Sequence, residues 1–133
     1  MKVIICVDKN NGMLFNNRRL SRDKVIYDYI LNIVKDNKLY CNEYSSSLFD
    51  SKENIIISND FLDKATKENY VFIENNKIPN QISELIVFRW NRLYPADTFF
   101  DENSIHLNNL KKISSKNFKG FSHNKITVDI FRR

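Results

Sequence analysis

The chain has 133 residues and a net charge of +5, with 28% charged and 42% hydrophobic residues. This length fits a single domain, residues 1–133, whose core needs no metal or disulfide, and the composition excludes a disordered chain. No run approaches the ~18 apolar residues that span a bilayer, so we expect no membrane partner. Cys6 and Cys41 both lie in apolar runs, which predicts buried free thiols. With no signal peptide, we expect a cytoplasmic protein.

Basic residues are spread along the whole chain, which indicates a general bias rather than a designed patch. The densest group is Arg18, Arg19 and Arg22, which we interpret first as a solvated face. A basic nucleic-acid-associated protein stays an alternative, because nucleic-acid binding needs clustered positive charge. In that alternative the contacts are made by Arg18, Arg19, Arg22, Arg89 and Arg92.

The first third of the chain predicts a strand, a loop and a helix. Residues 2–8 are a short β-branched apolar run, typical of a buried strand. Residues 9–19 carry turn-forming residues and predict a loop. Ser21 suits an N-cap and Asp23 a first helical turn, and apolar residues at helical spacing predict an amphipathic helix over 22–35.

The remaining chain predicts short strands and two brief helical segments. The order of strand, helix, strand, short helix and strand favours a parallel α/β core, and two consecutive strands at the end favour an antiparallel edge hairpin. The expected strands are 38–42, 54–58, 70–74, 84–91, 109–115 and 125–132, and the expected helical turns are 44–49 and 60–66.

Several strings occur in the same order as in one known family. They are Val7-Asp8-Lys9-Asn10-Asn11-Gly12, Leu20-Ser21-Arg22-Asp23, the run over 51–58, Ala96-Asp97-Thr98-Phe99-Phe100 and the run over 126–133. Together they resemble dihydrofolate reductase, and Asp97-Thr98-Phe99-Phe100 is the most specific of them. The resemblance implies an α/β fold with a central mixed sheet, mainly parallel with an antiparallel C-terminal edge hairpin, flanked by few helices.

The resemblance also implies a substrate side. Asp23 matches the catalytic acid that protonates or orients the pterin, and Lys52 matches the basic residue that holds the folate tail. Val7 and Phe88 lie on the same ligand-binding side. Phe88 takes the place of a threonine that supports the acid in the family, and phenylalanine cannot form a hydrogen bond. Asp23 therefore has a second explanation, as an ordinary acidic residue at the start of a helix.

The cofactor side departs from the family. Where the enzymes carry Gly-Arg-x-Thr, with an arginine that meets phosphates, this chain has Asn42-Glu43-Tyr44-Ser45. Glu43 reverses the charge at that position. The family's glycine pair, which lets the backbone approach the cofactor closely, is replaced by Glu74-Asn75. We therefore expect no cofactor, and NADPH only if the chain is a divergent reductase.

Residues 89–94 hold the sole tryptophan between two arginines. Arg89, Trp90, Arg92 and Tyr94 suit a partner surface with an aromatic anchor, and the alternative is a core-facing Trp90 with exposed or paired arginines. The pattern leaves open whether residues 122–125 lie beside this segment. His106 and His123 lack metal-site spacing, so we expect no metal.

Three functions follow from these observations. The first is a reductase-like domain that has lost NADPH-dependent catalysis and binds an unknown small molecule or protein. The second is a divergent oxidoreductase that retains a pterin-like site around Asp23. The third is the nucleic-acid-associated protein described above.

Overall fold

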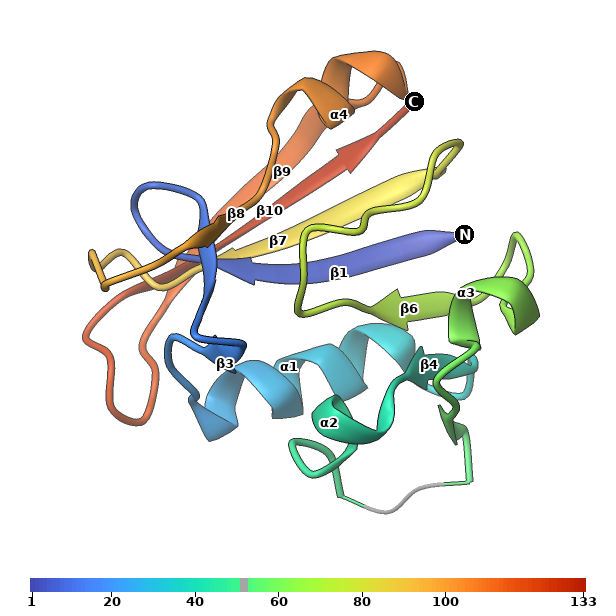
Figure 1. Cartoon of the computed structure of the whole chain (residues 1–133), viewed down its shortest axis with the longest axis horizontal. Helices are drawn as coiled ribbons and strands as arrows, with labels where there is room; N and C mark the ends of the chain where they lie inside the picture. Colours follow the sequence, from blue (N-terminus) through green and yellow to red (C-terminus); the bar gives the residue numbers. More distant parts are fainter. Residues whose placement is uncertain (51–52) are drawn as a thin grey trace.

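A computed structural model of the chain describes residues 1–50 and 53–133. Figure 1 shows strands and short helices wound around one central sheet. The elements, in chain order, are β1 (Lys2–Val7), β2 (Gly12–Phe15), β3 (Arg18–Arg19), α1 (Lys24–Val34), β4 (Leu39–Cys41), α2 (Glu43–Ser46), β5 (Ile55–Ile57), α3 (Phe61–Lys64), β6 (Tyr70–Phe72), β7 (Glu84–Arg89), β8 (Thr98–Phe99), α4 (Asn103–Leu107), β9 (Lys111–Phe118) and β10 (Ile126–Arg132).

The main sheet of the described residues has seven strands in the order β5-β4-β6-β1-β7-β10-β9. The pairs β4–β5, β4–β6, β1–β6 and β1–β7 are parallel. Strand β10 pairs antiparallel with β7 on one side and with β9 on the other. The expected mixed sheet, with a parallel core and an antiparallel C-terminal edge hairpin, is confirmed.

A second, small sheet replaces the loop that was expected over 9–19. In the part of the chain that the structure describes, it has the order β3-β2-β8. Strands β2 and β3 form a hairpin closed by Asn16 and Asn17, which both have positive φ angles, of 50° and 61°. Asparagine tolerates this conformation, and it suits the tight turn of a two-residue hairpin. The expectation of a plain loop was wrong, because such short strands form only where a partner strand meets them.

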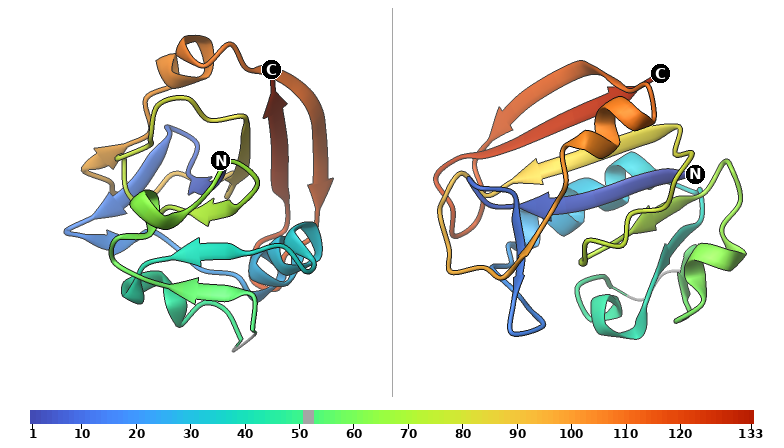
Figure 2. Two further views of the ribbon diagram at one scale, coloured as in Figure 1. Left: turned by 90° about the vertical axis from the view of Figure 1, so that its right-hand side faces the viewer. Right: turned by 45° about the horizontal axis from the view of Figure 1, so that its top comes forward.

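Helix α1 crosses one face of the main sheet (Figures 1 and 2). It begins after Asp23, whose side chain accepts a hydrogen bond from the backbone N–H of Val25. Asp23 is therefore the N-cap, and the expected cap at Ser21 was wrong. The buried side of the helix consists of Ile26, Tyr27, Ile30 and Val34.

The core lies in two layers, one on each face of the main sheet. One layer joins α1 to the sheet and contains Phe72, Phe88 and Trp90. The other lies under β2, β8 and α4 (Figure 2) and contains Met13, Phe100 and others. Helix α4 and strand β8 were not expected, whereas the other helices and strands of the main sheet fall within the expected ranges or within three residues of them. In the described residues no helix is long and apolar enough to cross a membrane.

Candidate functional site

The carboxylate of Asp23 accepts hydrogen bonds on both of its oxygens. Oδ1 accepts from the backbone N–H of Val25 at 3.0 Å and of Phe121 at 2.9 Å. Oδ2 accepts from the backbone N–H of Ser122 at 3.0 Å, and it lies 2.8 Å from Nδ1 of His123. The Ser122 hydroxyl adds a longer contact of 3.3 Å. The loop between β9 and β10 thus closes over the first turn of α1.

These bonds keep Asp23 ionised. Burial acts to raise the pKa of this carboxyl, but the hydrogen bonds from Phe121, His123, Ser122 and Val25 outweigh it and lower the pKa to about 2. A carboxylate that accepts several N–H bonds is stabilised in its charged form. Asp23 is therefore a buried anion, neutralised locally by donors of its own chain.

Gly120 makes the close approach of the loop possible. A Cβ atom at this position would lie 2.5 Å from Oδ2 of Asp23 and 2.7 Å from Cδ1 of Ile126. Both separations are well below ordinary van der Waals contact. Any side chain at residue 120 would therefore push the loop away from the carboxylate.

His123 joins Asp23 to two hydroxyl groups. Its Nε2 atom lies 3.0 Å from Oγ of Ser21 and 3.1 Å from the hydroxyl of Tyr94. The imidazole ring is buried and packs on the ring of Trp90, with centroids 4.9 Å apart and planes at 31°. Because Nδ1 faces a carboxylate, it carries the proton, and Nε2 is left to accept from a hydroxyl. Hydrogen bonds therefore connect Ser21 to His123 and His123 to Asp23.

A second polar cluster lies where β4 and β6 end. The Arg19 guanidinium binds both carboxylate oxygens of Glu74, at 2.8 and 2.9 Å. Ser45, at the start of α2, donates its hydroxyl to Glu74 at 2.7 Å. Arg19 also lies over the ring of Tyr44, 4.3 Å from its centroid. The side chain of Arg19 is thus held on three sides and fills the corner between α2 and the end of β6.

Phe88 is fully buried within an aromatic group beneath α1. Its ring meets Tyr29 edge-on with centroids 5.7 Å apart, and Tyr29 stacks on Phe118 at 4.8 Å. Edge-on and offset pairs of this kind stabilise a core. The residue expected on the ligand side is thus packed as a core residue in this structure.

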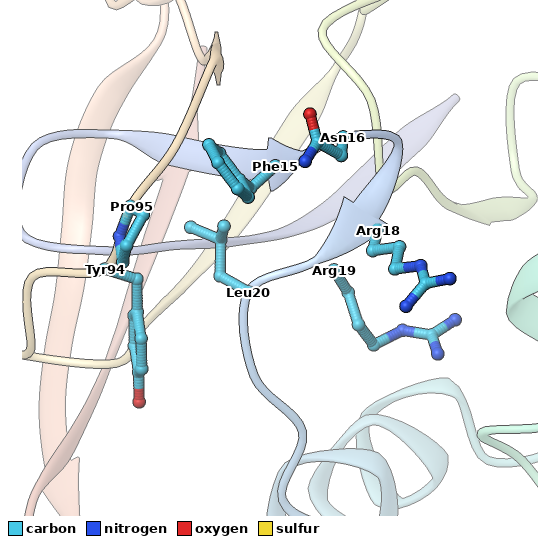
Figure 3. A pocket seen from close by; sticks show the side chains of 7 residues that line it. All are labelled: Phe15, Asn16, Arg18, Arg19, Leu20, Tyr94 and Pro95. Atoms are coloured by element: carbon cyan, nitrogen blue, oxygen red, sulfur yellow. The ribbon is translucent and has the colours of Figure 1, made fainter.

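A cavity of about 540 Å³ opens beside Tyr94 and the β2–β3 hairpin. Figure 3 shows Leu20 and Phe15 in the middle, with Tyr94 and Pro95 on one side and two arginines on the other. The wall is about equally polar and apolar, and its two arginines lie together at one side. The lining residues are Phe15, Asn16, Arg18, Arg19, Leu20, Tyr94 and Pro95.

The structure places the other predicted site residues as follows. Val7 is fully buried, and Lys52 lies outside the described residues. Arg89 forms an ion pair with Asp129 at 2.8 Å. Trp90 is buried. This is the core-facing arrangement, which was the alternative to a partner surface. Arg18, Arg22 and Arg92 are exposed.

Sequence reasoning missed His123 as a partner of Asp23. The sequence pattern showed only that His123 lacks the spacing of a metal ligand, and it left open whether residues 122–125 lie beside residues 89–94. In the structure, Nε2 of His123 does contact Tyr94 of that segment. The only local signal was Gly120, which marks a turn but does not show what the turn approaches. Among the residues that the structure describes, no group of three or more His, Cys, Asp or Glu side chains is placed to hold a metal ion.

The strand order and the helix across the sheet define an α/β domain with the dihydrofolate reductase fold. A search of solved structures gives dihydrofolate reductase of Enterococcus faecalis, in complex with NADP(H) and RAB-propyl, with a TM-score of 0.69. The alignment covers 99% of this chain and 95% of the enzyme, at 11% sequence identity. At this identity the likeness shows the fold alone. Neither a protein-family profile nor a curated protein sequence matches the chain.

Proposed function

We propose that this chain is a domain with the dihydrofolate reductase fold that has lost NADPH-dependent catalysis and binds a small ligand. The observation that carries this proposal is the saturation of Asp23. An acid that protonates or orients a bound pterin needs an oxygen facing the ligand. Here both oxygens are taken by Val25 and the loop over 121–123.

The residues at the cofactor position support the same proposal, because they do not fit a bound pyrophosphate. Glu74 and Glu43 place carboxylates where the family has a glycine pair and an arginine. Like charges repel, so a phosphate loses affinity at this corner. Arg19 pairs with Glu74 through two nitrogens of its guanidinium, so its positive charge neutralises that carboxylate and is not free to hold a phosphate.

The cavity of Figure 3 is the place where a ligand of this domain would bind. Its volume of about 540 Å³ is in the range of small-molecule sites, roughly 300–1,000 Å³. The apolar wall of Phe15, Leu20 and Pro95 suits an aromatic or aliphatic body, and the exposed Arg18 suits an anionic group. A small aromatic carboxylate has both features.

A protein partner is the second candidate. Leu93 is 69% exposed, and it follows the exposed Arg92 and precedes Tyr94 at the cavity. Arginine and aromatic residues such as tyrosine are enriched in protein interfaces. A cytoplasmic location, and the absence of a resident cofactor, belong to this proposal as well.

The test is a calorimetric titration with NADPH, alone and in the presence of dihydrofolate. The Enterococcus faecalis enzyme, solved with NADP(H), serves as the positive control. We expect no saturable heat with this chain. One-to-one binding tighter than about 10 μM, about −7 kcal/mol, would overturn the proposal and favour the divergent oxidoreductase.

The ligand class is tested by NMR titration with benzoate and naphthoate. We expect shifts at cavity residues, and a roughly tenfold weaker affinity in Arg18→Ala. Arg22→Ala is the matched control, because it removes an exposed arginine that does not line the cavity. Equal affinities of Arg18→Ala and Arg22→Ala would show that the carboxylate binds through the overall positive charge of the protein and not through Arg18. A steep loss of nucleic-acid binding with salt would instead favour the third function.

A further inference from the structure

The hydrogen-bonded side chains of Ser21, His123 and Asp23 have the geometry of a hydrolase triad. Oγ of Ser21 lies 3.0 Å from Nε2 of His123, and Nδ1 of the same ring lies 2.8 Å from Oδ2 of Asp23. These are the separations at which a serine, a base and an orienting carboxylate act together, and such triads are recognised by geometry and not by position in the sequence.

The environment of His123 fixes the ring in this arrangement. His123 is 3% exposed and is packed against Trp90, and Asp23 is held in turn by backbone N–H groups of the same loop. The carboxylate therefore holds the tautomer that leaves Nε2 free to take a proton. It also stabilises the imidazolium that forms when Nε2 does so.

Ser21 directly follows a residue of the cavity wall. It is partly exposed in the extended segment between β3 and α1, and it follows Leu20, which lines the cavity. Tyr94, whose hydroxyl lies 3.1 Å from the same Nε2, is a lining residue as well. The base thus lies between a serine and the wall of a cavity large enough for a small molecule.

We propose that Ser21 is the nucleophile of a small-ester hydrolase site, with His123 as general base and Asp23 as its positioning residue. The proposal rests on the cavity of the proposed function, but not on the loss of NADPH binding. The substrate class is a carboxylic ester with an aromatic or aliphatic group that fits between Phe15, Leu20 and Pro95. Serine is preferred over Tyr94 as the nucleophile because a phenolate is a better leaving group than an alkoxide, so an acyl-tyrosine would return its acyl group more readily.

Oγ of Ser21 bonds to the carbonyl carbon while its proton moves to Nε2 of His123, and the carbonyl electron pair moves to the oxygen. Tyr94, whose hydroxyl lies 3.1 Å from the same Nε2, is the proposed donor to that oxyanion. The intermediate then expels the alcohol, which takes the proton from Nε2. A water molecule repeats the sequence on the acyl-serine, which releases the carboxylic acid and returns the proton to Oγ.

The experiment is covalent labelling with an alkyl fluorophosphonate, with the modified residue located by peptide mass spectrometry. We expect modification at Ser21 and a loss of at least 100-fold in the rate of modification in Ser21→Ala. Ser104→Ala is the matched control, because it removes a serine of similar exposure on α4. His123→Gln should lose labelling to the same extent while retaining the circular dichroism spectrum of the fold.

Three results would overturn the proposal: no labelling, labelling at a residue other than Ser21, or an unchanged rate in folded His123→Gln. The outcomes separate it from the proposed function. A chain that binds aromatic carboxylates but is not labelled keeps the ligand-binding proposal and loses the hydrolase. A chain that binds NADPH and is labelled at Ser21 would overturn the proposed loss of NADPH-dependent catalysis and keep the hydrolase proposal.

Discussion

Nδ1 of His123 lies 2.8 Å from Oδ2 of Asp23, and together with the backbone N–H groups of Phe121 and Ser122 this contact ties the β9–β10 loop to the first turn of α1. Both side chains are nearly inaccessible to solvent, at 3% and 0%. In this fold the position that the resemblance assigns to a catalytic acid has become a junction between two distant segments. Its strength can be measured directly.

The stability of the protein should fall in acid because of Asp23. The folded-state pKa, about 2, is below the ordinary value of 3.8, so the stabilisation is present above pH 3.8 and is lost as the pH falls toward 2. The loss amounts to about 2 kcal/mol. We expect urea unfolding to show it as a wild-type advantage over Asp23→Asn that shrinks between pH about 5 and about 2.

The comparison with Asp23→Asn is needed because Asp129 titrates in the same direction. Burial raises the pKa of Asp129, but its bonds with Ser115 and Arg89 lower it overall. The contribution of Asp129 is present in both the wild type and Asp23→Asn, so it cancels in the difference between their free energies of unfolding. An advantage of wild type that stays constant down to pH about 2 would contradict the assignment to Asp23.

Substitution of Gly120 should loosen the junction. Gly120→Ala places a methyl group 2.5 Å from Oδ2 of Asp23, so the loop must move and weaken its hydrogen bonds. We expect a loss of about 1–3 kcal/mol in the free energy of unfolding. Lys119→Ala, at the exposed neighbouring residue, should change it by less than about 0.5 kcal/mol. Equal stability of the two variants would show that the close approach does not matter.

Removal of the Glu74 carboxylate should release Arg19. Glu74→Gln breaks the two-point ion pair and weakens the Ser45 bond, and we expect a loss of about 2 kcal/mol in stability. Glu68→Gln, at an exposed glutamate, is the matched control. The measurement is chemical denaturation at neutral pH. No difference between the variants would mean that the corner between α2 and β6 is held by packing alone.

Both thiols should be unreactive in the native state, in which Cys41 is buried, as predicted, and Cys6 is half-buried. Burial raises the pKa of Cys41 to about 11 and that of Cys6 well above its usual value. At pH about 8 the thiolate fraction of Cys41 is then about 100-fold lower than that of a free cysteine. An aromatic disulfide reagent should therefore react at least 100-fold more slowly with native than with urea-unfolded protein. Rapid reaction of the native protein would contradict this placement.

Much of the main sheet could be predicted from the sequence, because its strands are buried apolar runs. The runs at 2–8, 70–74 and 84–91 are hydrophobic enough to be read without their partners. Strands β2, β3 and β8 could not be read in the same way. They have two to four residues each, and their backbone bonds exist only because the segments meet in space.

The site was harder to predict for a physical reason. Asp23 was identified by the resemblance of residues 20–23 to the family's catalytic segment, but its partner His123 lies 100 residues later in the chain. No local pattern shows that the β9–β10 loop turns back onto α1. At Glu74 the sequence showed a charge that repels phosphate, but not that Arg19 would neutralise it.

The place of β10 between β7 and β9 has a consequence for synthesis on the ribosome. Until residues 126–132 have left the exit tunnel, β7 exposes one edge, β9 has no neighbour in the sheet, and Asp23 lacks the loop that neutralises it. Strand β1 also waits for partners some 70 to 80 residues downstream. The nascent chain thus completes its main sheet only after β10 has emerged, and it depends until then on protection of its unpaired strand edges.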